Sequence, residues 1–153
     1  MCDICGGMTE DEYAMRIVDN IRTHGWTVQY VLGEDQRNPP FGYTLGLSLR
    51  GHPEFIIFNC PQDGTYKTLE PLAHAVLGGR RFDEGDDISE FYAGPETAHL
   101  LRFPDSSTHL YAANSMLRRP GEPLVAALQV VWPSRAPLLA ETLRQQHEER
   151  GTR

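Results

Sequence analysis

The sequence predicts a single α+β domain, in which a mostly antiparallel sheet is covered by two helices. Three observations predict it. A chain of 153 residues has the size of one domain and can bury a core without disulfides. Helical periodicity is found at residues 9–24 and 63–77, whereas four other segments have the alternating or continuously apolar pattern of strands. The connections between the first three strands are too short for parallel crossovers.

The first helix is predicted from the stretch TEDEYAMRIVDNIRTHG. Thr9 and Glu12 have the spacing of a capping box, and apolar residues recur on one face as far as Ile21. His24 and Gly25 provide a C-terminal stop.

Strands are predicted at residues 26–32, 42–48, 55–60 and 124–132. The first two alternate between apolar and polar positions. FIIFNC and PLVAALQVVWP are nearly continuous apolar runs, which is typical of strands buried on both faces. The residues that we expect to be largely buried are Trp26, Ile56, Phe58, Val130 and Trp132.

The remaining segments are less regular. Pro71 interrupts the second helix and predicts a kink or a restart there. HLLRF is expected to be a short strand, and HLYAANSMLRR fits a strand or a helix equally well. We divide the chain into an N-terminal Cys-x-x-Cys segment at residues 1–8, the α+β domain at residues 9–133, and a polar tail at residues 134–153 that is expected to be helical.

Charge and composition exclude several classes of partner. The formal net charge is −7, and no run of Lys and Arg alternates with aromatic residues. This argues against nucleic acid, because phosphate neutralisation needs clustered cations. No apolar run approaches the ~18 residues of a membrane span, and the N-terminus does not resemble a signal peptide. We therefore expect a cytoplasmic protein without nucleic acid or membrane as a partner. An odd number of cysteines, three, argues against a disulfide framework.

Five stretches together resemble a known family: MCDICGG, HGWTVQYV, PPFGYTLGL, GHPEFIIFN and ALQVVWP. Their order is similar to that of a bacterial, mainly actinobacterial, family catalogued as domain of unknown function 4262. The resemblance covers residues 2–133 and implies one fold over this range, but no established reaction. Many members end in a short acidic and aromatic segment, whereas a polar tail follows Pro133 here.

The cysteine pair at the N-terminus has the spacing of a metal knuckle. Cys2 and Cys5 are followed by Gly6, and a glycine at this position takes a positive φ at low cost. Zinc is the expected ion, and it would need two further ligands. A second subunit could supply them as the same cysteine pair, which would make the protein a homodimer. Within the chain, the candidate ligands are His24, His52, His74, His99, His109 and Cys60.

Three other interpretations of the cysteine pair stay open. A redox pair usually lies at a helix N-terminus directly after a strand, and no strand is predicted before Cys2. Removal of Met1 would make Cys2 the N-terminal residue, with its α-amine as the base of a nucleophile. The third interpretation is a flexible start whose thiols have no function.

The stretch PPFGYTLGL is the second candidate site. Gly42 and Gly46 leave bare backbone inside a predicted strand, which often marks a bulge or the close approach of a ligand or neighbouring backbone. We expect a ligand pocket lined by Tyr43 or Thr44, which point to opposite faces, with His52 nearby. The alternative is that the glycines accommodate a bulky neighbour such as a tryptophan.

Three functions follow from these sites. The first is a cytoplasmic protein that binds a metal or a small ligand, with Cys2 and Cys5 as thiolate ligands. The second is a small enzyme with its pocket at Tyr43, Thr44 and His52. The third is a protein-interaction module. Stoichiometric zinc or iron would favour the first, and a coloured cofactor the second.

Overall fold

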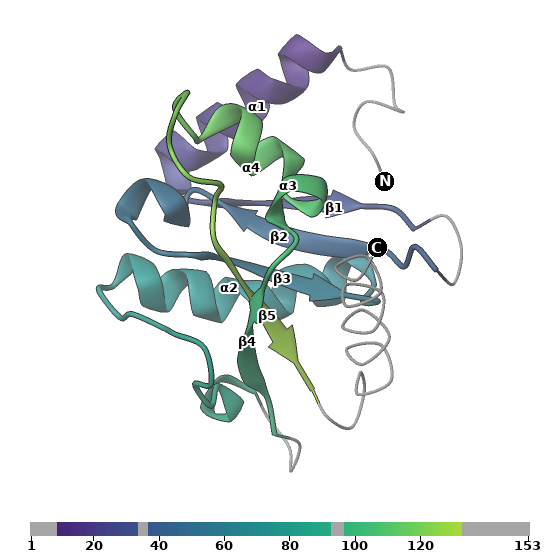
Figure 1. Ribbon diagram of the computed structural model, residues 1–153, viewed down its shortest axis with the longest axis vertical. Coiled ribbons are helices and arrows are strands. Elements are labelled where there is room, and N and C mark those ends of the chain that lie inside the picture. The colour runs from purple at the N-terminus through teal and green to yellow at the C-terminus, as the bar shows by residue number, and fades with distance from the viewer. Residues whose placement is uncertain (1–8, 34–36, 93–96, 133–153) are drawn as a thin grey trace.

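The computed structural model describes residues 9–33, 37–92 and 97–132 (Figure 1). The predicted Cys-x-x-Cys segment at residues 1–8 and the predicted tail at residues 134–153 lie outside these ranges. The described elements are, in order, α1 (Glu10–His24), β1 (Thr27–Val31), β2 (Phe41–Leu45), η1 (Leu47–Arg50), β3 (Glu54–Phe58), α2 (Gln62–Leu77), η2 (Ser89–Phe91), β4 (His99–Phe103), α3 (Ser106–His109), α4 (Tyr111–Met116) and β5 (Ala127–Val131).

Five strands form one sheet in the order β1-β2-β3-β5-β4. The first three make an antiparallel meander, and β4 pairs antiparallel with β5. Only β3 and β5 run parallel, with Ile56 opposite Gln129. The predicted α+β class with a mostly antiparallel sheet is therefore confirmed. The four predicted strand regions contain β1, β2, β3 and β5, and HLLRF is β4.

The helices differ from the prediction in two respects. The segment HLYAANSMLRR is helical and carries the end of α3 and all of α4, so four α-helices are described where two were predicted. Of the kink or restart predicted at Pro71, the restart is wrong, because α2 continues through this residue without a break; the kink stays a prediction. A proline removes a single main-chain donor, and the buried Leu69 and Leu72 hold α2 on the sheet on both sides of it. Among the helices of the described ranges, none has both the length and the apolar composition of a membrane span.

Helices cover both faces of the sheet and create two cores (Figure 1). The core between the sheet and α2 includes Trp26, Phe55, Ile57, Leu69, Leu72 and Val130. The core between the sheet and α1, α3 and α4 includes Ile17, Tyr43, Ile56, Phe58 and Leu110. Neighbouring residues of β3 belong to different cores because side chains alternate along a strand. All five residues predicted to be most buried are buried, and the most exposed of them, Trp132, is 8% exposed.

The two ends of α1 are capped by the residues that the sequence predicts. The Thr9 hydroxyl accepts a hydrogen bond of 3.1 Å from the Glu12 N–H, which caps the first turn. At the other end Gly25 has a φ of 86°, and the chain turns directly into β1. Gly46 packs against this turn, since a Cβ at Gly46 would lie 2.7 Å from the Gly25 carbonyl oxygen. The close contact fixes the start of β1 against the end of β2.

Candidate functional site

A cleft of about 260 Å³ opens between the end of α1 and α2, beside the start of β1. The tight turn at Gly25 joins α1 to β1 and brings residues before and after it to the cleft. The other lining side chains belong to α2, where they are two helical turns apart and project in similar directions. The lining residues are Asn20, His24, Trp26, Thr27, Tyr66 and His74.

Stacked aromatic rings form one wall of the cleft. The rings of Trp26 and Tyr66 are 5.6 Å apart and inclined by 22°, and His74 meets Trp26 edge-on at 5.9 Å. Trp26 is only 4% exposed, whereas Tyr66 is 48% exposed. Such pairs contribute about 0.5–1.5 kcal/mol each beyond the area they bury. Tyr66 is therefore held by its neighbour on one face while much of its ring stays open to solvent.

Polar groups surround this wall. The Asn20 side-chain amide donates a 3.5 Å hydrogen bond to the Thr27 hydroxyl, and His24 and His74 are exposed. Neutral imidazoles provide one donor and one acceptor each. Burial raises the pKa of the Tyr66 phenol, and the neighbouring Glu70 raises it further, so the phenol is a hydrogen-bonding group and not an anion at neutral pH.

The cleft has the composition of a binding site. It combines an aromatic surface with a few convergent polar groups, as small-molecule sites do. Within the described ranges, no group of three or more His, Cys, Asp or Glu side chains is placed to hold a metal ion. The two histidines of the cleft are thus a pair without a third described ligand.

The predicted ligand residues Tyr43 and Thr44 lie on opposite faces of β2, and both are engaged within the protein. The Tyr43 side chain is 1% exposed, and its hydroxyl accepts a 3.0 Å hydrogen bond from the Ala112 N–H. Burial raises the pKa of this phenol. The Thr44 hydroxyl donates to Glu54 at 2.7 Å and accepts from the Phe55 N–H at 2.9 Å. Each residue therefore joins distant segments of the chain.

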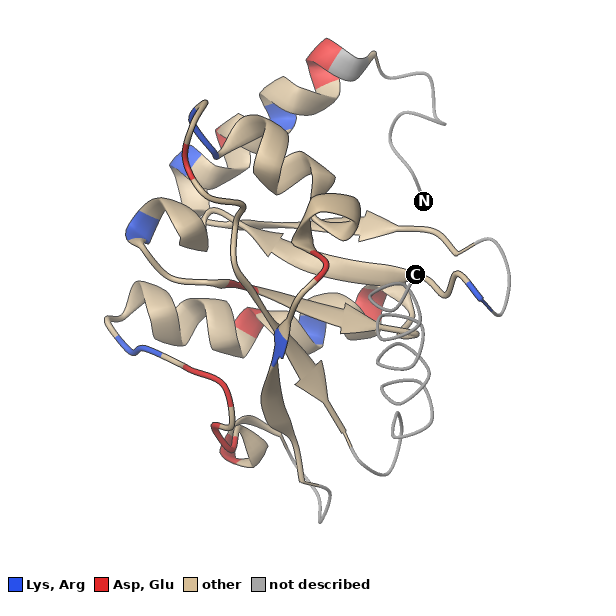
Figure 2. Cartoon of the chain, in the orientation of Figure 1, with Lys and Arg blue, Asp and Glu red and all other residues tan. Residues whose placement is uncertain are grey.

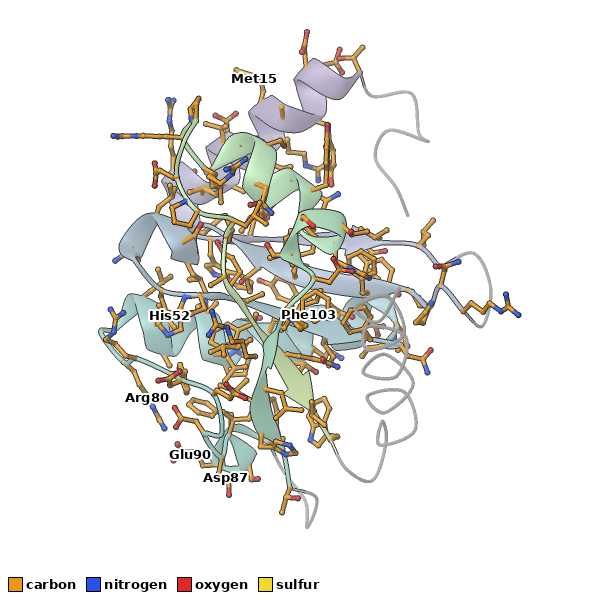
Figure 3. All side chains as sticks on the ribbon, viewed as in Figure 1. Met15, His52, Arg80, Asp87, Glu90 and Phe103 are labelled. Carbon is orange, nitrogen blue, oxygen red and sulfur yellow. The ribbon has the colours of Figure 1, made fainter. Side chains whose placement is uncertain are left out.

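His52, labelled in Figure 3, is only 3% exposed and is therefore buried. Its Nε2 accepts a 2.9 Å hydrogen bond from the Phe82 N–H, and its Nδ1 is 2.8 Å from the Pro53 carbonyl oxygen. An acceptor at Nε2 and a donor at Nδ1 together require the neutral ring. Burial is the main cause that lowers the pKa of His52, and the nearby Arg81 lowers it as well.

The glycines of PPFGYTLGL are explained by close neighbours. A Cβ at Gly42 would lie 2.4 Å from the Thr65 methyl and 3.3 Å from the Tyr30 ring. Gly46 has a φ of 121° and faces the main chain of the turn at Gly25. These contacts support the structural alternative, in which the glycines accommodate close neighbours. Thr65 and Tyr30 lie beside Gly42, and the main chain of Gly25 and Trp26 lies beside Gly46. A ligand at Tyr43, Thr44 and His52 stays a prediction.

A buried carboxylate that the sequence interpretation missed lies at the start of β3. Glu54 is fully buried and accepts four hydrogen bonds. Its Oε1 receives them from the Thr44 hydroxyl at 2.7 Å and the Leu47 N–H at 3.2 Å. Its Oε2 receives them from the Gly46 N–H at 3.1 Å and the Ser48 N–H at 2.9 Å.

Three consecutive amides around an anion form a nest, and here the anion is the protein's own carboxylate. Burial raises the pKa of Glu54, while hydrogen bonds from Ser48, Thr44 and Gly46 act in the opposite direction. The carboxylate fills the nest, so these amides hold η1 in place rather than offering a site to a ligand. The only local signal was an acidic residue at the head of the apolar run FIIF.

A family model described as Domain of unknown function (DUF4262) matches residues 20–138, which is most of the chain. The chain belongs to the DUF4262 family. No curated protein and no solved structure matches it. Glu54 and all the residues that line the cleft fall within the part matched to DUF4262, whereas Cys2 and Cys5 precede it.

Of the three cysteines in this DUF4262 protein, Cys60 alone lies in the described ranges. It is half-buried and free, and its carbonyl oxygen accepts a 2.7 Å hydrogen bond from the Tyr30 hydroxyl. It follows β3, whereas His52 precedes β3, so the two lie at opposite ends of a strand. Cys2 and Cys5, the predicted metal ligands, lie outside the described residues.

Proposed function

We propose that this DUF4262 domain binds a small, flat, polar molecule in the cleft between α1 and α2. One observation carries the proposal: the stacked Trp26–Tyr66 pair, with His74 against it, lies in a cleft whose other lining groups are polar. The half-exposed Tyr66 ring offers a face on which a planar ligand can stack. Asn20 and His24 supply donors and acceptors for its edge.

The size of the cleft limits the ligand. Pockets for drug-sized molecules span about 300–1,000 Å³, and a cleft of about 260 Å³ falls just below that range. A single ring that carries amide, hydroxyl or amino groups fits this volume. The chemistry of binding would be stacking on Tyr66 combined with two or three hydrogen bonds.

The proposal is tested by titrating the protein with a set of single-ring polar compounds while amide NMR signals are recorded. For at least one compound, we expect the shifted amide signals to belong to the C-terminal end of α1 and to the part of α2 from Tyr66 to His74. Tyr66→Ala should weaken its binding by about tenfold, which corresponds to about 1.4 kcal/mol. Tyr111→Ala is the matched control, because Tyr111 is an exposed tyrosine on α4. Equal affinities in both variants, or shifts elsewhere only, would contradict the proposal.

A second candidate function is metal binding by Cys2 and Cys5. The Cys-x-x-Cys-Gly spacing supports it, and the other ligands would come from histidines, from Cys60 or from a second copy. Elemental analysis of untagged protein under reducing conditions tests it. We expect stoichiometric zinc in the wild type and none after Cys2→Ser with Cys5→Ser, and metal-free wild-type protein would contradict this function.

A further inference from the structure

The two edge strands of the sheet, β4 and β1, differ in whether another stretch of main chain bonds to their outer side. Outside β4, the main chain of residues 85–88 runs alongside the strand and uses its free groups. The Gly85 N–H donates to the Leu100 carbonyl oxygen at 2.8 Å, and the Leu100 N–H donates to the Asp86 carbonyl oxygen at 3.0 Å. The Ile88 N–H donates to the Ala98 carbonyl oxygen at 2.9 Å. β4 is therefore covered, whereas β1, at the other edge, pairs with β2 alone among the described strands.

The register of the meander shows which main-chain groups of β2 point to β1 and which point to β3. The Asn59 N–H donates to the Pro40 carbonyl oxygen at 2.7 Å, so this pair bonds across the β2–β3 ladder. Bonded and non-bonded pairs alternate in an antiparallel ladder. Gly42, opposite Ile57, is therefore the next bonded pair, and Tyr43 turns its main-chain groups to β1.

The same alternation identifies the free groups of β1. Gln29 lies opposite Tyr43 and bonds to it. Val28 and Tyr30, on either side of Gln29, consequently direct their N–H and C=O groups away from the sheet. No backbone hydrogen bond within the described ranges joins either residue to a segment beyond β1. Among the described residues, these four main-chain groups therefore form an open edge.

We propose that β1 pairs with β1 of a second copy of this chain, antiparallel and centred on Gln29. In this register Val28 of each copy lies opposite Tyr30 of the other, and the two pairs exchange four main-chain hydrogen bonds. A β-branched residue beside an aromatic one is a favourable cross-strand pair. β1 is free of Lys, Arg, Asp and Glu (Figure 2), so no like charges meet although each copy has a formal charge of −7.

Exposed apolar side chains support the same register. Leu32 follows β1 and is 58% exposed. In the paired strands, Leu32 of the second copy lies opposite Trp26, and opposed residues point to the same face of a sheet. That face carries Tyr66, which is 48% exposed and stacks on Trp26. The pairing thus buries Leu32 of one copy beside Tyr66 of the other, and the two-fold axis repeats the contact.

Sedimentation equilibrium from about 1 µM to about 1 mM protein, without added ligand, tests the pairing. We expect a monomer–dimer equilibrium in the wild type. Leu32→Glu should raise the dissociation constant at least tenfold, whereas Leu49→Glu, which changes an equally exposed leucine, should leave it unchanged. Val28→Pro removes an outward N–H but no bond to β2, and it should also weaken the dimer relative to Val28→Ala.

Two results would overturn the proposal. One is a wild type that stays monomeric up to about 1 mM, whether or not its edge accepts some other strand. The other is a dimer that Leu32→Glu leaves unchanged, and this result decides the matter even if Val28→Pro does not fold. Neither outcome depends on whether the cleft binds a ligand, because the ligand is absent from the experiment.

Discussion

Replacing Glu54 by glutamine tests whether a buried anion holds the loop after β2. Glutamine keeps the shape of the side chain but turns one carboxylate oxygen into an NH₂ group, which cannot accept a hydrogen bond. If the NH₂ takes the place of Oε2, the Gly46 and Ser48 amides both lose their acceptor. If it takes the place of Oε1, only the Leu47 amide does, because the Thr44 hydroxyl can turn to accept.

The orientation with the NH₂ group in place of Oε1 is favoured, because it leaves fewer amides without an acceptor. It therefore determines the expected loss of stability. One buried N–H without a partner costs about 1–3 kcal/mol. Each of the three remaining bonds also changes from charge-assisted to neutral and loses about 1 kcal/mol. Removing a buried charge offsets about 2 kcal/mol of the total loss. We expect Glu54→Gln to lower the free energy of unfolding by about 2–4 kcal/mol.

Urea denaturation followed by far-UV circular dichroism measures this change. Glu84→Gln is the control, since Glu84 is an exposed glutamate and its substitution should change stability by no more than about 0.5 kcal/mol. The reasoning fails if Glu54→Gln is as stable as this control, because the four donors would then have no need of an anion.

Two further predictions concern other buried residues. His52 has a lowered pKa and is neutral when folded, so the unfolded chain binds more protons below its ordinary pKa of about 6.5. The free energy of unfolding should therefore fall as the pH drops below about 6.5. This fall should shrink in His52→Gln and persist in His24→Gln; equal pH profiles for all three proteins would contradict the assignment. Ile56→Ala should destabilise the fold by about 2–5 kcal/mol in the same denaturation assay, because Ile56 is 0% exposed in β3. An unchanged midpoint, or a loss no larger than that of the exposed Met15→Ala (Figure 3), would show that its packing is dispensable.

Local patterns predicted much of the fold because local forces determine those parts. The cap at Thr9, the stop at Gly25 and the alternation in β1 and β2 each depend on neighbours within a few positions. The parallel pairing of β3 with β5 was not predicted, since its register depends on residues far apart in the chain. HLYAANSMLRR fitted both helix and strand, and its packing in the helical form includes the bond from Ala112 to Tyr43.

The cleft was harder to predict than the fold. The sequence indicates a helix stop at His24, a core position at Trp26 and a helix over the segment that contains Tyr66, and each of these assignments is locally correct. His24 as a metal ligand stays a prediction. Only the fold brings the three together, because it places the end of α1, the residues before β1 and α2 around one cleft. Thr44 and His52 show the converse, because polar side chains that suggested a ligand site are satisfied inside the protein.

The parallel pair of β3 and β5 also bears on how the chain is assembled. During synthesis from the N-terminus, the meander of β1, β2 and β3 and the helix α2 leave the ribosome first. The edge of β3 that β5 will occupy is then an unpaired row of amides and carbonyls beside Ile56. Pairing β5 with β3 closes a long loop made of all the residues between them, which is slow compared with forming the local hairpins. We expect the nascent chain to spend its most aggregation-prone interval with β3 open, and to leave that interval only when residues 127–131 have been made.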